Sequence, residues 1–158
     1  MVDIKRVEAL GQKSDICDSI LHALPSWFGV EASIADYINK VKSMPFWAAF
    51  DGEHPIGFIA LKVHNSYTVE ICVMGVLKEY HRHGIGKRLI EYCEQFCQNH
   101  HAEFLTVKTL DASAPSNSYA KTRQFYLALG FRPLEVFPLH WDKDNPCLFM
   151  AKYLPEKQ

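Results

Sequence analysis

A predicted strand, a turn with two glycines and an amphipathic helix follow one another between residues 68 and 101, and this succession constrains the fold most. Gly84 and Gly86 lie in the turn, and no Ser, Thr, Asp or Asn stands at the helix start to cap it. The first N–H groups of a helix have no intrahelical partner and lie at the positive end of its dipole. Glycines let a bulky anion approach this bare backbone. The sequence therefore predicts an anion site, best suited to a pyrophosphate.

Positive and titratable side chains surround the turn and favour the same ligand. They are His81, Arg82, His83, Lys87 and Arg88. Two common nucleotide motifs do not fit this segment. A Walker A loop requires Ser or Thr after its Gly-Lys pair, where Arg88 stands, and a dinucleotide-binding fingerprint requires a third glycine, where Leu89 stands.

The spacing V-x-x-x-x-H-x-x-G-x-G, from Val76 to Gly86, resembles motif A of the GNAT superfamily of acyl-CoA-dependent N-acyltransferases. In that family, main-chain N–H groups of the loop hold the pyrophosphate of coenzyme A. His81 stands where the family has Arg or Gln, and the neighbouring Arg82 can supply the charge. The resemblance implies acetyl-CoA as cosubstrate, and no metal is expected. The implied cofactor-binding residues are Met74, Gly75, Val76, His81, Arg82, His83, Gly84, Ile85, Gly86, Lys87, Asn117 and Tyr126.

A second segment resembles motif B of the same family. Tyr126-x-x-x-Gly130-Phe131 ends a predicted helix and has the family spacing, in the right order after motif A. The resemblance implies that Tyr126 is catalytic, pointing at the coenzyme sulfur and protonating the leaving thiolate. By helical spacing alone, Tyr126 would instead be a core aromatic. The family often has an Asn seven residues before this tyrosine; Tyr119 stands there, with Asn117 close by.

Glu70 is the candidate catalytic base. It lies six residues before Val76, where a GNAT subset resembling the histone acetyltransferases carries its base glutamate. Strand alternation predicts that Glu70, Cys72 and Met74 share one face of a strand. Two alternatives stay open. Glu70 is an ordinary solvated strand carboxylate in the first, and ordered water carries the proton in the second.

The acceptor pocket is predicted from aromatic loops. Pro25 to Gly29 contains Trp27 and Phe28 and lies where the resembling fold shapes its acceptor site, while Trp141 would form the opposite wall. Core packing explains Trp27 and Phe28 equally well. Pairs of histidines at 81 and 83 and at 100 and 101 have no Cys or carboxylate at ligand spacing, which favours a solvated surface role over a metal site.

Composition bounds the remaining classes. A chain of 158 residues with 48% hydrophobic content fits one domain with a full core. A net charge of −1 gives no reason to expect nucleic acid as a partner, and no apolar run is long enough for a membrane span. Five cysteines, an odd number, favour free thiols in a reducing compartment, so a cytoplasmic location is expected. The resemblance is also compatible with a homodimer.

Hydrophobic periodicity predicts the order of the elements. Strands are expected at 2–10, 46–50, 56–64, 68–76, 104–110, 131–139 and 147–154, and helices at 16–24, 30–42, 84–101 and 118–129. Ser14 and Asp15 are the predicted caps of the first helix, and residues 140–146 are a predicted linker. This order predicts an α/β (α+β) class: one GNAT-like domain with a central mixed sheet of about seven strands and about four helices.

The expected function is that of an N-acetyltransferase moving an acetyl group from acetyl-CoA to a primary amine by direct attack in a ternary complex. The N-acetyltransferase domain is expected to span 1–158; the resemblance covers 46–154 most clearly, and 1–45 would supply acceptor-site helices. The acceptor is a small-molecule or peptide amine of open identity. Three alternatives remain: a non-catalytic acyl-CoA-binding or sensing module, a regulatory interaction protein, and an acyltransferase for longer acyl chains.

Overall fold

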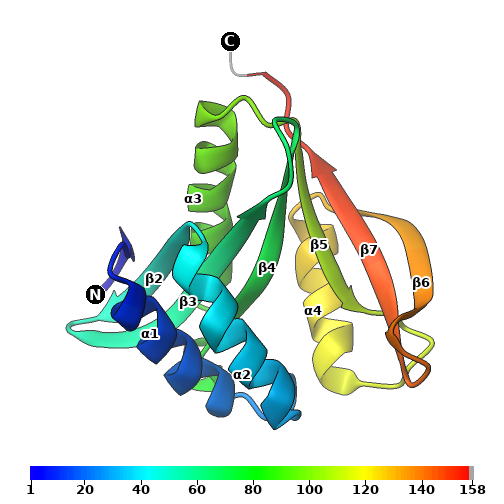
Figure 1. Cartoon of the computed structure of the whole chain (residues 1–158), viewed down its shortest axis with the longest axis horizontal. Helices are drawn as coiled ribbons and strands as arrows, with labels where there is room; N and C mark the ends of the chain where they lie inside the picture. Colours follow the sequence, from blue (N-terminus) through cyan, green and yellow to red (C-terminus); the bar gives the residue numbers. More distant parts are fainter. Residues whose placement is uncertain (157–158) are drawn as a thin grey trace. The chain divides into compact units, whose positions relative to one another are not determined.

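The computed structural model describes residues 1–156. Its strands and helices follow the order expected from the sequence (Figure 1). The strands are β1 (Val2–Arg6), β2 (Phe46–Asp51), β3 (His54–Val63), β4 (Thr68–Val76), β5 (Phe104–Leu110), β6 (Arg132–Asp142) and β7 (Asn145–Tyr153). The helices are α1 (Leu10–His22), α2 (Glu31–Lys40), α3 (Ile85–Asn99) and α4 (Asn117–Ala128), with short 3₁₀ turns η1 (Val41–Ser43) and η2 (Lys78–Tyr80).

Contacts divide the chain into two compact units. The first contains residues 1–62 and 72–96, and the second contains residues 63–71 and everything from 97 onward. Strand β4 contributes residues to both, because the division falls between Ile71 and Cys72. Each unit is therefore described by itself.

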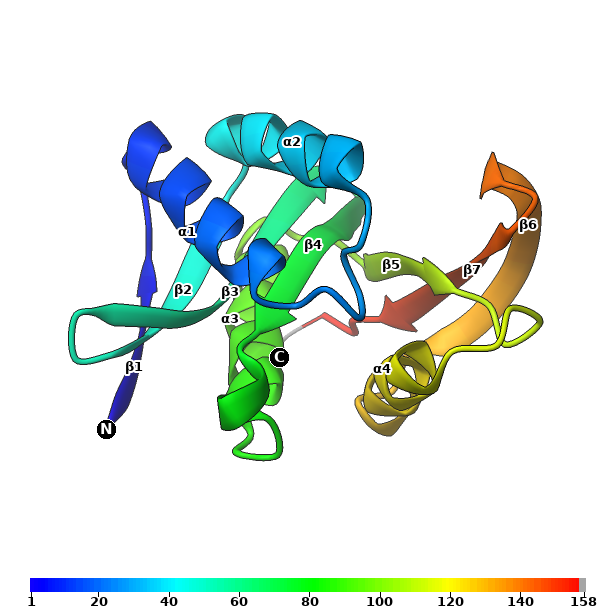
Figure 2. The same cartoon turned by 90° about the horizontal axis from the view of Figure 1, so that it is seen from below.

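In the first unit, strands run in the order β1-β2-β3-β4, and β2 is antiparallel to both β1 and β3. Helices α1 and α2 lie on one face of β2, β3 and β4, and α3 lies on the other (Figure 2). The core under α1 and α2 is apolar and closely packed. Phe46 and Phe58 are fully buried there and stack with ring centroids 5.3 Å apart. Burial of such rings is the main source of stability in a core of this kind.

One glycine lets α1 approach the sheet. A Cβ on Gly75 would lie 3.0 Å from Leu24 Cδ1 and 3.1 Å from Ile20 Cγ2. The end of α1 therefore rests directly on the β4 backbone, which no larger residue at 75 would allow without displacing those side chains. This contact fixes where the loop that follows α1 begins.

In the second unit, strands run in the order β4-β5-β7-β6, and helix α4 lies against one face of β5, β7 and β6 (Figure 2). The pair β4–β5 is parallel, with Glu70 opposite Thr106, and β5–β7 and β6–β7 are antiparallel. Within residues 1–156, seven strands and four helices confirm the predicted α+β class with a mixed sheet.

Several predicted boundaries are correct, but the strand expected at 2–10 ends at Arg6, and two further local predictions are wrong. Strands β4 and β5 have the predicted bounds, and Gly130 has the positive φ of 97° expected after a helix end. Helix α1, however, begins already at Leu10, so Ser14 lies inside it and donates its hydroxyl hydrogen to the Ile38 carbonyl instead of capping.

The predicted linker 140–146 is the second error. Strand β6 extends to Asp142 and β7 begins at Asn145, which leaves only a two-residue turn. Asp142 Oδ1 accepts hydrogen bonds from Asp144 N and Asn145 Nδ2, both at 2.9 Å. The polar residues that suggested a loop therefore form the turn of a long hairpin.

Candidate active site

The glycine turn forms as predicted. Helix α3 begins at Ile85, and the preceding Gly84 has φ of 74°. A Cβ at Gly84 would meet nothing within 4 Å, so the backbone here is open to a ligand. The Gly84 carbonyl accepts from Arg88 N, the hydrogen bond expected of a residue at a helix cap position. Since glycine has no side chain, the helix start has no side-chain cap from this residue, and the site suits an anion.

The side chains of the turn divide into two groups. His83 and Lys87 are exposed, as is Arg82, which has φ of 65°, an unusual conformation for a residue other than glycine. His81 instead points back, and its Nε2 donates to the Val76 carbonyl at 2.7 Å. This hydrogen bond closes the loop from strand to helix. His81 thus helps to fix the conformation of the loop, whereas the exposed side chains of the turn are open to solvent.

The loop between α1 and α2 contacts the glycine turn. Trp27 is half-buried, and its ring meets the His81 ring edge-on with centroids 5.6 Å apart. Phe28 meets Tyr37 of α2 edge-on at 6.2 Å. Both aromatic residues pack against the core cluster under α1 and α2. Trp27 and Phe28 therefore take part in core packing, and both stay partly exposed.

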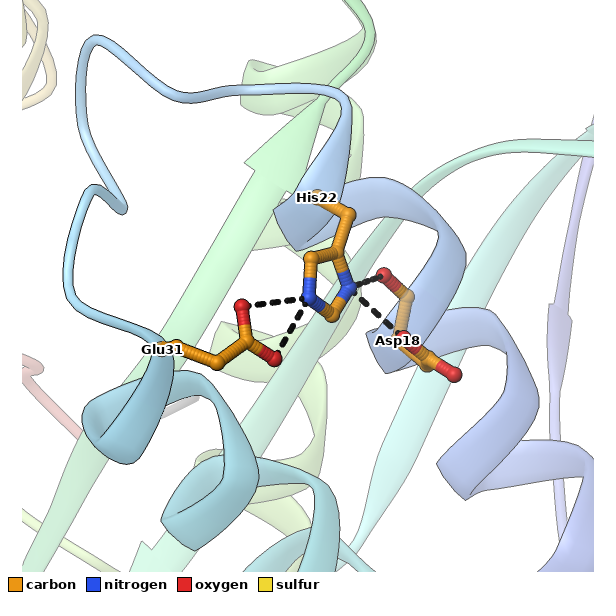
Figure 3. Close-up of polar contacts among 3 residues, drawn as sticks. All are labelled: Asp18, His22 and Glu31. Carbon is orange, nitrogen blue, oxygen red and sulfur yellow. Dashed lines mark hydrogen bonds and ion pairs between the residues drawn. The ribbon is translucent and has the colours of Figure 1, made fainter.

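A histidine clasp joins the two ends of that loop (Figure 3). His22 Nδ1 lies 2.6 Å from Asp18 Oδ1, and Nε2 lies 2.9 Å from both carboxylate oxygens of Glu31. The hydrogen bond to Glu31, followed by that to the Asp18 backbone, raises the pKa of His22 to about 9. Because His22 closes α1 and Glu31 opens α2, the clasp fixes the span of the intervening residues.

We expect this clasp to stabilise the fold only while His22 is protonated. The folded pKa is raised above the ordinary value of 6.5, so the contribution is complete below pH 6.5 and is lost as the pH rises through about 9. His22→Gln should lower the melting temperature slightly at pH 6, because the pair is exposed, and should have no effect at pH 10. Thermal melts of both proteins at the two pH values measure this. An equal difference at both would contradict it.

In the second unit, helix α4 carries Tyr126, the candidate proton donor to the leaving thiolate. Tyr126 is buried, with ring contacts to Phe125 and Phe131 at centroid distances of 5.3 Å each. Helix α4 is capped by Ser116, whose hydroxyl accepts from Tyr119 N at 3.2 Å. Asn117 follows this cap and is exposed. Its side chain therefore does not take the capping role.

Glu70 is not a solvated strand carboxylate. Its side chain is only 11% exposed and forms an ion pair with Lys108, whose Nζ lies 3.1 Å from Oε2 and 3.2 Å from Oε1. His64 Nε2 lies 2.6 Å from Oε1. The structure thus brings Glu70 together with two residues that the sequence analysis did not single out. A lysine inside the apolar strand 104–110 was the available signal, because buried lysines are nearly always paired.

The remaining predicted residues are placed as follows. Met74 and Val76 are half-buried and Gly75 is buried on β4 of the first unit, while Trp141, on β6 of the second, is 44% exposed. Two surface hollows of about 290 Å³ and 560 Å³ lie within the first and second unit, respectively, and no predicted site residue lines either. Within residues 1–156, no helix is long and apolar enough to cross a membrane. That part of the chain also holds no cluster of three His, Cys, Asp or Glu side chains fit for a metal ion.

Solved structures share this architecture over nearly their full length. A putative acetyltransferase of the GNAT family from Desulfovibrio desulfuricans has a TM-score of 0.81 at 15% identity, with 98% of this chain and 100% of that one covered. The ribosomal-protein-S18-alanine N-acetyltransferase from Escherichia coli has a TM-score of 0.77 at 16% identity, with 100% of this chain and 97% of that one covered. An aminoglycoside 6'-N-acetyltransferase complexed with coenzyme A has a TM-score of 0.75 at 19% identity, with 99% of each chain covered. No curated protein matches the sequence.

The fold is therefore that of the acetyltransferases. The sequence assigns the chain more closely, because residues 15–131 match the acetyltransferase (GNAT) family. This chain belongs to that family, as motifs A and B predicted. The family consists of enzymes that use acetyl-CoA.

Proposed function

We propose that this protein is an N-acetyltransferase that moves the acetyl group of acetyl-CoA to a primary amine by direct attack in a ternary complex. The open start of α3 behind Gly84 is the observation that carries the proposal. Its first N–H groups suit the pyrophosphate of coenzyme A, and the exposed Arg82 and Lys87 suit its charge. The backbone of β4 from Met74 to Val76 would pair with the pantetheine arm.

Two residues are assigned to proton transfer. The amine must lose a proton before its nitrogen attacks the thioester carbon, and Glu70, directly or through water, provides the route for that proton. A new carbon–nitrogen bond then forms while the carbon–sulfur bond breaks, and the attacking nitrogen releases its second proton to solvent, which leaves the neutral amide. The Tyr126 hydroxyl gives its proton to the departing thiolate and regains one from solvent. Burial of Tyr126 in an aromatic cluster keeps the phenol in one orientation.

The acceptor is proposed to be a small-molecule or peptide amine. Trp27 and Phe28, on the loop between α1 and α2, and Trp141 on β6 are the proposed acceptor-binding aromatics. We propose that residues 1–158 act as one N-acetyltransferase domain, with 1–45 as its acceptor-site helices. The five free cysteines support the proposed cytoplasmic location.

A titration of the purified, cofactor-free protein with acetyl-CoA tests the proposal, with coenzyme A and ATP run beside it. Saturable micromolar binding of acetyl-CoA without comparable binding of ATP is the expected result. Turnover of acetyl-CoA with a panel of amines then separates the enzyme from a non-catalytic acyl-CoA-binding module, which would bind and not turn over. Absence of acetyl-CoA binding would overturn the proposal.

A charge reversal at the helix start sharpens this test. Lys87→Glu places a carboxylate within the first turn of α3, where it competes with the pyrophosphate for the positive end of the helix. We expect acetyl-CoA to bind about tenfold more weakly, or about 1.4 kcal/mol. Lys62→Glu, an equal charge change at an exposed position of β3, is the matched control. Equal affinities of the two variants would place the pyrophosphate elsewhere.

A further inference from the structure

Three side chains of the second unit form a connected polar group, the His64–Glu70–Lys108 cluster. His64 directly follows β3, Glu70 lies on β4 and Lys108 lies on the neighbouring strand β5. A short contact between His64 Nε2 and Glu70 Oε1 and an ion pair between Lys108 and Glu70 join the three. A buried carboxylate such as that of Glu70 is costly unless its hydrogen bonds are satisfied, and here His64 and Lys108 satisfy them.

The Glu70 carboxylate has little capacity left for a substrate. Oε1 contacts both His64 Nε2 and Lys108 Nζ, and Oε2 contacts Lys108 Nζ. The glutamate side chain is 11% exposed, whereas the His64 side chain is 33% exposed. Solvent and ligands therefore reach the cluster more readily through the imidazole than through the carboxylate.

The hydrogen bond also fixes the imidazole. A carboxylate only accepts hydrogen bonds, so Nε2 of His64 carries the hydrogen and donates it to Glu70. In the neutral ring, Nδ1 then keeps its lone pair and is the basic nitrogen. A carboxylate that holds one imidazole nitrogen and leaves the other as base is the arrangement of the hydrolase triads. Lys108 holds the carboxylate in turn, with its ammonium 6.0 Å from the Phe149 ring centroid.

A buried thiol also lies near the cluster. Cys147 on β7 is fully buried and feels the charges of both Lys108 and Glu70. Burial raises the pKa of this thiol to about 11, so it stays neutral at physiological pH. Imidazole is the side chain best suited to accept a proton near neutral pH. The cluster thus contains one exposed base, held by one carboxylate and one ammonium.

We propose that His64 is the general base that deprotonates the acceptor amine, and that Glu70 and Lys108 are positioning residues acting through it. This inference rests on the proposed function and refines its proton route, because Glu70 then acts through His64. An N–H bond of the acceptor ammonium breaks and an Nδ1–H bond forms, which leaves a neutral amine and an imidazolium. The Nε2–H hydrogen bond to Glu70 persists, and the imidazolium later releases its Nδ1 proton to water.

Turnover kinetics of His64→Gln test the base. We expect kcat to fall about 100-fold at pH 7, with an unchanged dissociation constant for acetyl-CoA. The difference in kcat between His64→Gln and the wild type should become smaller as the pH approaches about 10, because alkyl amines are then already neutral when they bind. His54→Gln, at the opposite end of β3, is the matched control and should behave as wild type. Wild-type turnover and an unaltered pH profile in His64→Gln would overturn the inference.

Lys108→Met tests positioning. Methionine keeps the apolar stem of the side chain while removing the charge. Loss of a positive charge makes the Glu70–His64 pair more basic, so the acidic limb of the pH–rate profile should move to higher pH. A merely structural role of Lys108 would lower kcat and leave that limb in place.

A measurement independent of turnover completes the test. Nitrogen-15 NMR of the imidazoles in the full chain should show neutral His64 with its hydrogen on Nε2, and in Glu70→Gln that preference should be weakened. Hydrogen on Nδ1 in the wild type would overturn the inference even without a known acceptor. If acetyl-CoA fails to bind, the proposed function falls and the inference with it. If acetyl-CoA turns over normally in His64→Gln, only the inference falls.

Discussion

Tyr126→Phe is expected to reduce kcat about 100-fold while the dissociation constant for acetyl-CoA stays nearly unchanged. The substitution removes one hydroxyl group and keeps the ring that packs against Phe125 and Phe131. A thiolate that leaves without a proton donor raises the barrier of the second half of the reaction, whereas ground-state binding does not involve that proton. Steady-state kinetics combined with calorimetric titration separate the two quantities.

A second tyrosine provides the control. Tyr92→Phe makes the same chemical change on α3, at a side chain that is 43% exposed. It should leave both kcat and affinity at wild-type values. Equal turnover in Tyr126→Phe and wild type would remove Tyr126 from the mechanism, and a parallel loss of acetyl-CoA affinity would indicate a binding role instead.

Phe58→Ala is expected to cost about 3–5 kcal/mol of the free energy of unfolding. Phe58 is fully buried and stacks on Phe46 with an interplanar angle of 13°. Its removal leaves a cavity between β3 and the helices α1 and α2, which pack on the same core cluster. Since the free energy of unfolding of a domain is commonly about 5–15 kcal/mol, this one change would remove a large part of it.

Denaturant titration measures that loss. The midpoint concentration should fall while the slope stays constant, because the surface exposed on unfolding changes little. Leu139→Ala is the control, since that side chain is 75% exposed and its truncation should change stability by no more than about 0.5 kcal/mol. A comparable loss in both variants would mean that the Phe46–Phe58 stack is not a major source of stability.

The parts of the fold that the sequence predicts are those with strong local patterns. The apolar runs of β4 and β5 and the glycine before α3 are visible without tertiary information. The start of α1 was not predictable in this way. Its N-cap residue is Ala9, which offers no side-chain cap. The position of the helix is therefore set by the burial of Ile16 and Ile20 in the tertiary structure and not by local helix propensity.

The site is predictable to a similar degree. Motif spacing predicts the glycine turn, which the structure contains before α3, and it names Tyr126 as the proposed proton donor, a role that stays a prediction. The partners of Glu70 were not predicted, since Lys108 meets Glu70 through the pairing of β4 with β5 and His64 meets it from the segment that follows β3. Strand register, which sequence periodicity alone does not fix across a parallel pair, is the missing information.

The edge contact between Trp27 and His81 has a thermodynamic consequence. It joins the loop proposed to bind the acceptor to the loop proposed to bind the coenzyme. If acetyl-CoA changes the free energy of this contact, the acceptor's affinity changes by a corresponding factor, and the acceptor must change acetyl-CoA affinity by that same factor. In that case, the occupancy of one substrate site of the proposed reaction would change the affinity of the other through this pair of rings.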